Sequence, residues 1–590
     1  MKINRNTLWA ETFVNELVES GIKYACVSPG SRNTSLTLAF AGNKNIKSFV
    51  HIDERSSAFF ALGLAKVSGS PVAIVTTSGT ATAELYPAII EAYQQRVPLI
   101  VCTADRPPEM LNRGANQTIN QNNLYKNHIC WFFDAGLPEP NGKKIKHIKA
   151  LANRAVFECC IRSRGPVHLN FPFRKPFEPY DFTDDVSIDL IEYANLPISK
   201  IKIYDRSDEP VIKKEKWFIH LYNYVRKFDK GLIFAGPENY NLPFHQNCLK
   251  LSNLLGYPLL ADGASQLRFG QSNDENLITN YDAVLRSKNF SEEHNPDIII
   301  QFGRTATSKA LEEYFEQCNS LRFMINEFGD WFDPSNKANE VYACKPFLFC
   351  EKMNEQLEKQ NFIRKTSRWL NEFKDADKIA NNLRVKIIEH AKFPNEGRVI
   401  KELIDALPDD LNLMLSNSMP VRDFDYFAPR TDKKISVFNN RGASGIDGIN
   451  STALGVLADS GKPTLLLTGD MAFYYDLNGL LAAKKYSLPL VIVLINNDGG
   501  GIFEVLPISA YGKVFKEYFI ASHHLDFAPF VKGYGGNYKL IQSWEDFSSS
   551  IKKAFKQKKF TVLELKTDAK KSLKNRRLYW AKTAEALNGC

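Results

Sequence analysis

The sequence predicts an α/β fold made of three doubly wound, parallel-sheet domains. Short apolar stretches alternate with stretches of helical spacing along most of the chain, which is typical of parallel sheets with crossover helices. Some of the apolar runs, such as Leu488–Ile495, are continuous rather than alternating, as expected for strands buried on both faces. With 590 residues, the chain has room for about three to four domains of ordinary size.

The first block covers residues 1–185 and begins with an amphipathic helix. Its predicted strands are YACVSPG, KSFVHID, PVAIVTTSG, PLIVCTADRP and GPVHLNFP. A polar, proline-containing passage from about Glu178 to Pro210 is expected to be a linker. These features predict one doubly wound domain followed by a flexible connection.

Two further blocks follow. The second covers residues 211–355, with predicted strands GLIFAGPE, PLLADGAS and PDIIIQFG. A charged helical connector, from about Glu351 to Lys392, leads to the third block, residues 395–590. Blocks one and three look like two versions of one architecture.

Composition narrows the class of protein. The chain is 44% apolar and 24% charged, as in soluble globular proteins, and no apolar stretch reaches the roughly 20 residues of a membrane helix. Ten cysteines without CxxC spacing are expected to be reduced thiols in a cytoplasmic protein. The net charge of +9 lies largely after Ile551, where we expect a solvated helical surface. No nucleic-acid-binding motif accompanies it, so no nucleic-acid partner is expected.

The most informative local pattern lies in the third block. Gly469-Asp470 ends one apolar run, and Asn497 follows the strand Leu488–Ile495, with a stretch of helical spacing between them. Parallel strands joined by a right-handed crossover bring their carboxyl ends together, where open α/β sheets bind ligands. A carboxylate, an amide oxygen and the carbonyl of Gly499 are oxygen ligands suited to Mg²⁺ and a diphosphate.

Further polar residues follow other predicted strands. In the first block, Glu54 opens a helix of small and apolar residues directly after a strand ending at Asp53. Arginine binds carboxylates through a planar fork, so several arginines at sheet ends indicate substrates that carry several carboxylates. These arginines and their neighbouring polar residues are Ser31, Arg32, Arg106, Asn116, Gln117, Ser418, Arg422 and Arg441.

The pattern from Gly469-Asp470 to Asn496-Asn497 resembles the thiamine-diphosphate motif. The resemblance implies that Gly469, Asp470, Asn497, Gly499 and Ile502 contact the cofactor. Asp470, Asn497 and the Gly499 carbonyl would be the ligands of Mg²⁺, with Mn²⁺ as an alternative ion. Ile502 would wedge beneath the cofactor. Glu54 would be the catalytic carboxylate, placed against N1′ of the aminopyrimidine.

The match extends to one family of such enzymes, the 2-succinyl-5-enolpyruvyl-6-hydroxy-3-cyclohexene-1-carboxylate (SEPHCHC) synthases of menaquinone biosynthesis. It rests on SPGSR, DERSSAFFALGLAK, TSGTA, TADRPPE, GANQTI, GPVHLNFPFRKP, NRGASGIDG and YDLNGL-to-NNDGGGIF, and spans all three blocks. The blocks would then be the pyrimidine-binding, middle and diphosphate/Mg-binding domains. A cofactor shared between subunits implies a homodimer or a dimer of dimers.

The resemblance implies a transferase that decarboxylates 2-oxoglutarate and adds the succinyl carbanion to isochorismate in 1,4 fashion, releasing CO₂. The eight residues named above, together with Lys309, fall at the family's substrate positions. Two departures concern the pocket: the middle domain has Ser308-Lys309-Ala310 where a basic pair is common, and Glu84 stands where asparagine is common.

Two alternatives remain open from sequence. One is another thiamine-diphosphate carboligase or decarboxylase, such as an acetohydroxyacid synthase, although the middle block has no convincing flavin signature. The other is a non-catalytic regulatory subunit, which would be expected to have lost Glu54 or Asp470. The adjacent His523 and His524 are not expected to bind one metal, because neighbouring side chains point apart.

Overall fold

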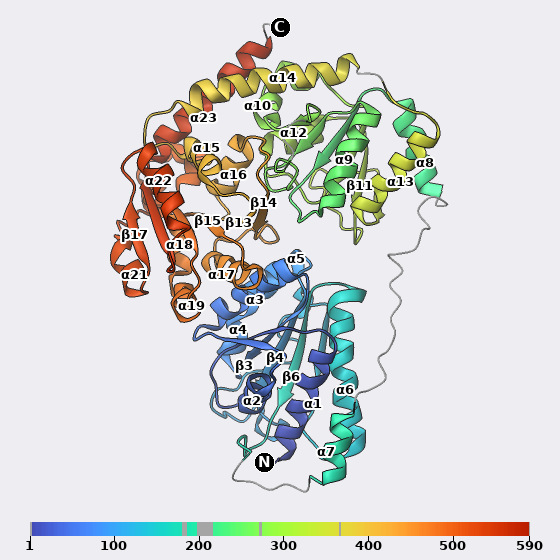
Figure 1. Ribbon diagram of the computed structural model, residues 1–590, viewed down its shortest axis with the longest axis vertical. Helices are drawn as coiled ribbons and strands as arrows, with labels where there is room; N and C mark the ends of the chain where they lie inside the picture. Colours follow the sequence, from blue (N-terminus) through green and yellow to red (C-terminus); the bar gives the residue numbers. More distant parts are fainter. Residues whose placement is uncertain (1–2, 180–185, 197–215, 271–273, 365–366, 589–590) are drawn as a thin grey trace.

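A computed structural model of the chain describes residues 3–179, 186–196, 216–270, 274–364 and 367–588, and contains three six-stranded sheets. Every strand pairing is parallel, as the sequence predicts. The first domain lies below the other two in Figure 1, with the third domain above it on one side and the middle domain on the other. Helices flank each sheet, so each domain is a doubly wound α/β unit.

The first-domain sheet has the strand order β2-β1-β3-β4-β6-β5. All five strands predicted for this domain are present, and β5 is an additional edge strand. The elements are α1 (Arg5–Glu19), β1 (Tyr24–Val27), α2 (Thr34–Gly42), β2 (Lys47–Val50), α3 (Glu54–Ser68), β3 (Val72–Thr76), α4 (Thr80–Glu84), α5 (Tyr86–Gln94), β4 (Leu99–Asp105), η1 (Pro108–Met110), η2 (Lys126–His128), β5 (Trp131–Asp134), α6 (Gly142–Phe157), η3 (Glu158–Arg162), β6 (Pro166–Pro172) and α7 (Ile188–Asn195).

The third-domain sheet repeats that arrangement, with the order β14-β13-β15-β16-β18-β17. Strands β15 and β16 carry the two halves of the predicted cofactor motif. The elements are α15 (Glu396–Ala406), β13 (Leu411–Leu415), α16 (Met419–Phe427), β14 (Ile435–Asn439), α17 (Ile449–Ser460), β15 (Thr464–Gly469), α18 (Asp470–Tyr475), η7 (Leu477–Gly479), α19 (Leu480–Lys485), β16 (Val491–Asn496), η8 (Gly501–Val505), η9 (Pro507–Ala510), α20 (Gly512–Phe515), η10 (Lys516–Ile520), α21 (Phe527–Gly533), β17 (Asn537–Leu540), α22 (Trp544–Ala554), β18 (Thr561–Lys566) and α23 (Ala569–Asn588).

The middle-domain sheet has a different order, β12-β11-β10-β7-β8-β9, which is the order of dinucleotide-binding folds. A buried ion pair joins this domain to the third, because Arg268 donates to Asp425 of α16 at 2.8 Å. The elements are α8 (Lys216–Lys227), β7 (Gly231–Ala235), α9 (Leu242–Leu255), β8 (Leu259–Ala261), β9 (Leu277–Ile278), α10 (Tyr281–Leu285), α11 (Lys288–Glu293), β10 (Ile298–Phe302), α12 (Lys309–Gln317), β11 (Leu321–Asn326), β12 (Glu340–Ala343), α13 (Pro346–Lys359), α14 (Arg368–Arg384) and η6 (Val385–Glu389).

Local structure departs from the sequence prediction at three places. The expected linker contains helix α7, which packs Leu190 and Ala194 onto α1 and α6; residues 180–185 and 197–210 of that passage lie outside the described part. Strand β2 ends at Val50 rather than Asp53, because Asp53 instead caps α3 by accepting from the Ser56 N–H. The expected solvated C-terminal surface includes Arg576, which is 3% exposed.

Helices α3 and α17 hold the first and third domains together. They lie side by side at the junction in Figure 1, and their contact is the most extensive between any two helices. Two glycines permit this approach: a β-carbon on Gly63 would lie 2.1 Å from the Thr452 carbonyl oxygen, and one on Gly455 would lie 2.1 Å from the Phe60 carbonyl oxygen. Backbone therefore packs on backbone at this crossing.

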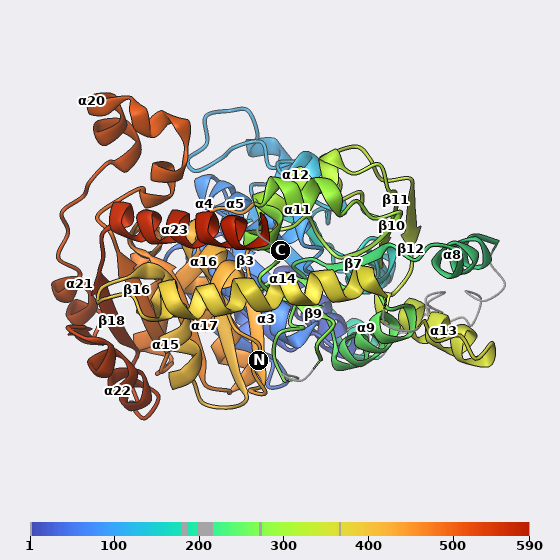
Figure 2. The ribbon, with the colours of Figure 1, turned by 90° about the horizontal axis from the view of Figure 1, so that it is seen from above.

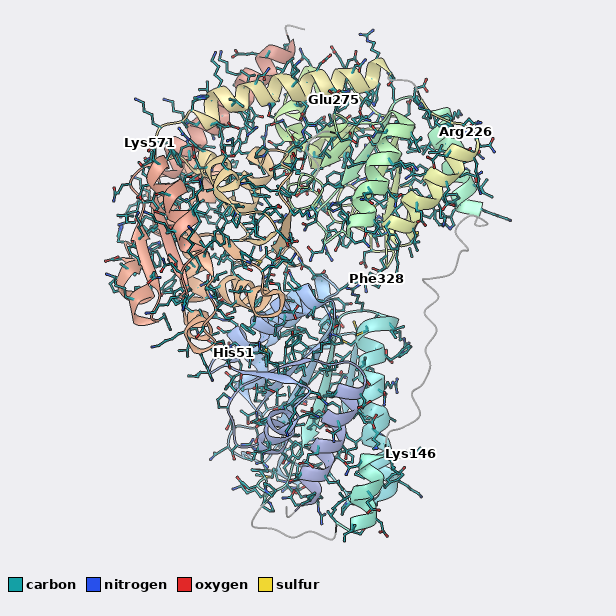
Figure 3. The ribbon with its side chains drawn as sticks, in the orientation of Figure 1. His51, Lys146, Arg226, Glu275, Phe328 and Lys571 are labelled. Carbon is teal, nitrogen blue, oxygen red and sulfur yellow. The ribbon has the colours of Figure 1, made fainter. Side chains whose placement is uncertain are left out.

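The middle domain also contacts the first. Phe328, labelled in Figure 3, lies at this boundary, where the Arg96 guanidinium stacks 4.8 Å from its ring centre and donates to Asp330 at 2.7 Å. Above the sheets, α14 and α23 run next to each other across the middle and third domains (Figures 1 and 2). The C-terminal helix is thereby packed into the body of the molecule.

Candidate active site

The ends of β15 and β16 bring Asp470 and Gly499 together. Asp470 begins α18, is 3% exposed, and accepts from the backbone N–H groups of Met471 at 2.7 Å and Gly499 at 2.9 Å. Burial raises the pKa of the Asp470 carboxyl, and those two N–H groups oppose the increase. Gly499 has φ +134°, and a β-carbon there would lie 2.1 Å from the Ile520 carbonyl oxygen, so only glycine fits.

Asn497 follows β16 and offers an unsatisfied oxygen. Its Nδ2 donates to the Glu396 carboxylate at 3.0 Å, while its Oδ1 is buried and has no hydrogen-bond partner among the described residues. A buried acceptor without a partner is costly, and a cation would satisfy it. Gly501 packs against this amide, and Ile502 lies next to it in η8, half-buried. Together with Asp470, these residues fit a hard divalent cation that carries a diphosphate.

Glu54 is the first residue of α3 and is half-buried. Burial is the largest influence that raises the pKa of its carboxyl, and the negative charges of Asp53 and Glu84 raise it further. Glu84, which stands where asparagine is common, therefore raises the pKa of the expected catalytic carboxylate. Helix α3 buries Ala58, Ala61, Leu62 and Ala65 as predicted.

Two arginines of the first domain lie close together at the ends of β1 and β4. Arg32 donates to the Phe173 carbonyl at 2.8 Å, and Arg106 donates to the Asn116 carbonyl at 2.6 Å and to Ser78. Burial lowers the pKa of Arg32 to about 10, and repulsion from Arg106 contributes. The Nε atoms of both arginines are buried and have no hydrogen-bond partner in the part of the chain that the structure describes. Two adjacent guanidiniums with unused donors form a site suited to an anion.

The remaining first-domain candidates surround this pair. Gln117 donates to the Ser78 carbonyl at 3.1 Å, so the exposed loop that carries Asn116 and Gln117 is tied to the end of β3. Ser31 is exposed and lies next to Arg32, in the turn before α2. The structure thus brings Ser31, Arg32, Arg106, Asn116 and Gln117 into one region.

A second basic cluster lies between the middle and third domains. Arg422 donates to the Ser418 carbonyl at 2.7 Å, and Ser418 precedes α16 with φ +71°. Arg422, Arg441 and Lys309 all act electrostatically on Glu312 of α12, although Lys309 is largely exposed and pairs with Glu313. Burial lowers the pKa of Arg441. No hydrogen bond or ion pair between described residues links this cluster to Glu54, to Asp470 or to the Arg32–Arg106 pair.

Three acidic residues at these sites were missed from sequence, and His523 was given no role there. Glu312 faces the second cluster, Glu91 accepts from the Gly442 and Ala443 N–H groups beside Arg441, and Glu396 binds Asn497. His523 Nε2 lies 3.3 Å from Asp470, whereas His524 pairs with Asp498. His523 Nδ1 also lies 3.6 Å from Asp498, so the two histidines share that carboxylate and His523 faces Asp470 as well. Among the three acidic residues, only Glu396 had a signal in the sequence, because it stands at the start of a predicted helix.

Comparisons with known proteins identify the family of the three domains. Three family models match: the thiamine pyrophosphate enzyme N-terminal TPP binding domain over residues 9–124, the middle domain of thiamine pyrophosphate enzymes over residues 201–415, and the C-terminal TPP binding domain over residues 429–565. Among solved structures, 4-hydroxybenzoylformate decarboxylase from Rhodococcus jostii has a TM-score of 0.71 at 14% identity, covering 95% of this chain and 99% of that one. At that identity the likeness speaks for the fold alone.

Curated relatives are similar along nearly the whole chain, and three carry the name 2-succinyl-5-enolpyruvyl-6-hydroxy-3-cyclohexene-1-carboxylate synthase. The protein from Bacillus cytotoxicus is 39% identical, covering 97% of this chain and 95% of its own. The protein from Haloarcula marismortui is 37% identical, covering 99% of both chains, and that from Listeria monocytogenes is 36% identical, covering 98% of both.

Proposed function

The chain belongs to the SEPHCHC synthase family of thiamine-diphosphate enzymes, and on that premise we propose the following reaction and residue roles. The protein is a transferase that decarboxylates 2-oxoglutarate and adds the remaining four-carbon unit to isochorismate in 1,4 fashion, giving SEPHCHC and CO₂. The observation that supports the cofactor part of this proposal is the pair of buried oxygen atoms, on Asp470 and Asn497, at the ends of β15 and β16.

Thiamine diphosphate supplies the electron sink for decarboxylation, and a divalent cation such as Mg²⁺ anchors its diphosphate. The cation would be held by Asp470, by Oδ1 of Asn497 and by the carbonyl of Gly499. The fit of glycine alone at position 499 and the unpartnered Asn497 oxygen support this assignment. Ile502 lies beside these ligands and is suited to support the cofactor from below.

Glu54 would hold a proton against the aminopyrimidine ring. A carboxyl group whose pKa is raised by burial and by neighbouring negative charge is biased towards sharing a proton. Its place at the start of a buried helix fixes that carboxyl relative to α17 and the third domain. Glu54 is therefore the residue to which we assign proton transfer at N1′.

The basic residues would bind the carboxylates of the two substrates. Arg32 and Arg106 form one anion site, with Ser31, Asn116 and Gln117 around it, and the second cluster contains Lys309, Ser418, Arg422 and Arg441. The guanidiniums have unused donors in the first cluster, and in the second cluster they face the acidic residues Glu312, Asp262 and Glu91. Two separate cationic regions suit a pair of substrates that are both anionic.

We propose that two copies of the chain complete the site, as a homodimer or a dimer of dimers. Large apolar side chains are exposed near Glu54 and α18, including Ile52 at 72%, Tyr474 at 55% and Tyr475 at 50%. An exposed apolar patch of this kind favours a protein interface. No nucleic-acid partner is proposed, because no binding motif accompanies the basic C-terminal segment.

We assign the protein to the cytoplasm. Every cysteine in the described part of the chain is a free thiol, which suits a reducing compartment. None of the helices among the described residues is both long and apolar enough to cross a membrane.

The test is an assay with both substrates. The purified protein would be incubated with Mg²⁺, thiamine diphosphate, isochorismate and either 2-oxoglutarate or pyruvate, and products identified by mass spectrometry. We expect SEPHCHC and CO₂ with 2-oxoglutarate only. Product with pyruvate but not with 2-oxoglutarate would overturn the assignment in favour of another carboligase.

A further inference from the structure

The Asn497 carboxamide has two ends of opposite character, and only one of them can bind a cation. Its Oδ1 is an acceptor, whereas its Nδ2 carries two hydrogens and would repel a metal ion. In the structure Nδ2 donates to Oε1 of Glu396 at 3.0 Å, and Oδ1 is buried with no partner among the residues described. The orientation of the amide is therefore set by the group that faces Nδ2.

Glu396 is well suited to set the orientation of the Asn497 amide. An ionised carboxylate only accepts hydrogen bonds, so it cannot pair with Oδ1 and stabilises one orientation of the amide alone. Glu396 is 1% exposed and is fixed at the start of α15. Thr567 also donates to its Oε1 at 2.9 Å, and Arg576 donates to its Oε2 at 2.7 Å.

Arg576 balances the buried charge. This residue of the C-terminal helix α23 is 3% exposed, and it also donates to Asp423 of α16 at 2.7 Å. A buried carboxylate without such a partner would be strongly disfavoured. Both carboxylate oxygens of Glu396 thus accept hydrogen bonds, so Glu396 contacts Asn497, the proposed metal ligand, rather than the cation.

We propose that Glu396 is a positioning residue that holds the Asn497 carboxamide with its oxygen towards the divalent cation. The inference rests on the proposed cofactor site at Asp470, Asn497 and Gly499. The proposed metal centre then includes Glu396, which lies 101 positions before Asn497 in the chain. It also depends on Arg576 of the C-terminal helix, whose positive charge pairs with Glu396. Partners that orient metal ligands typically contribute about 10–100-fold to metal affinity.

The test measures Mn²⁺ binding to the full-length protein with saturating thiamine diphosphate, from the electron paramagnetic resonance signal of free Mn²⁺. Glu396→Gln is expected to weaken Mn²⁺ binding by about 10–100-fold. In that variant a side-chain NH₂ must face either Arg576 or Asn497, and the second arrangement turns the Asn497 amide away from the metal. Glu396→Asp retains charge for Arg576 but shortens the reach to Asn497, and should weaken binding in the same direction.

Asp423→Asn is the matched control. It removes the other carboxylate of Arg576 and should lower the melting temperature, yet it leaves the contact between Glu396 and Asn497 intact, so Mn²⁺ affinity should stay within about twofold of wild type. Equal losses of affinity in Glu396→Gln and Asp423→Asn would mean that Glu396 acts only through stability, and would overturn the proposal.

A double variant provides a further readout. Combining Glu396→Gln with Asn497→Asp exchanges donor and acceptor. The amide is then at position 396 and donates to the carboxylate at position 497, whose second oxygen can still bind the metal. We expect this pair to bind Mn²⁺ more tightly than Glu396→Gln alone; no recovery counts against the positioning role. Wild-type protein that binds no Mn²⁺ would overturn the proposed cofactor site itself. Wild-type binding with unweakened Glu396→Gln and Glu396→Asp would overturn only the role of Glu396.

Discussion

Replacement of Gly63 by alanine is expected to force α3 and α17 apart. The new β-carbon would lie 2.1 Å from the Thr452 carbonyl oxygen and 3.0 Å from the α-carbon of Gly455. Both are backbone atoms of a packed helix, so no side-chain rotation relieves the contact. Overpacking at the upper end of its usual range costs about 3 kcal/mol, and the higher helix propensity of alanine offsets about 1 kcal/mol, leaving a loss of about 2 kcal/mol.

The assay is thermal unfolding by calorimetry. Because the entropy of unfolding grows with chain length, a loss of this size should lower the melting temperature of the unit containing the two domains by about 2–3 °C. Gly455→Ala, which meets the Phe60 carbonyl oxygen at the same distance, should have a similar effect. The double variant should lose less than the sum, because helices already separated by one methyl group leave room for the second.

Gly42→Ala is the control, since a β-carbon at this exposed helix end would have no atom within 4 Å. It should leave the melting temperature unchanged or slightly raised. A Gly63→Ala protein as stable as wild type would refute the reasoning, as would strict additivity of the two glycine replacements.

The other predictions concern the site and the pH range. Glu54→Gln should retain cofactor binding, measured by calorimetric titration, and lose about 10²–10⁴-fold in turnover; unchanged turnover would remove Glu54 from the mechanism. Gly499→Ala should weaken Mn²⁺ binding, because a β-carbon would collide with the Ile520 carbonyl at φ +134°; binding like that of wild type would exclude the loop as a ligand. Burial lowers the pKa of His51 from 6.5 to about 4, so folding favours the neutral imidazole. The free energy of unfolding should therefore keep its full value above pH 6.5 and fall by about 3 kcal/mol as the pH drops towards 4. Replacement His51→Phe should make the melting temperature depend less on pH in this range. An unchanged pH dependence in that variant would contradict the prediction.

The parallel sheets could be predicted because their strands are locally distinctive. Strand Val491–Asn496 is buried along its whole length, and its residues are apolar up to the terminal Asn496, which the sequence displays directly. Asp470 and Asn497 follow from the same logic, since the positions after adjacent parallel strands share one edge. The edge strands β5 and β17 are only partly buried and were not predicted, although the equally exposed edge strand β2 was.

The partners of the site residues could not be predicted, because their contacts depend on tertiary structure. Glu396 meets a residue 101 positions away, and its own neighbours in sequence indicate only the start of a helix. Arg576 lies in a lysine- and arginine-rich stretch that favours a solvated surface, yet it is buried against Glu396 and Asp423. A charge that is compensated by a distant partner leaves no local pattern.

The crossing of α3 and α17 has the symmetry of a dimer although it lies within one chain. Gly63 meets the carbonyl of the residue three places before Gly455, and Gly455 meets the carbonyl of the residue three places before Gly63. Such reciprocity defines an isologous interface, in which one surface patch binds a copy of itself. Since the two helices occupy equivalent places in sheets of identical strand order, the chain contains the interface of two twofold-related domains. This reciprocal contact is what would result if an ancestral domain had formed a dimer through this helix and its gene had later been duplicated and fused.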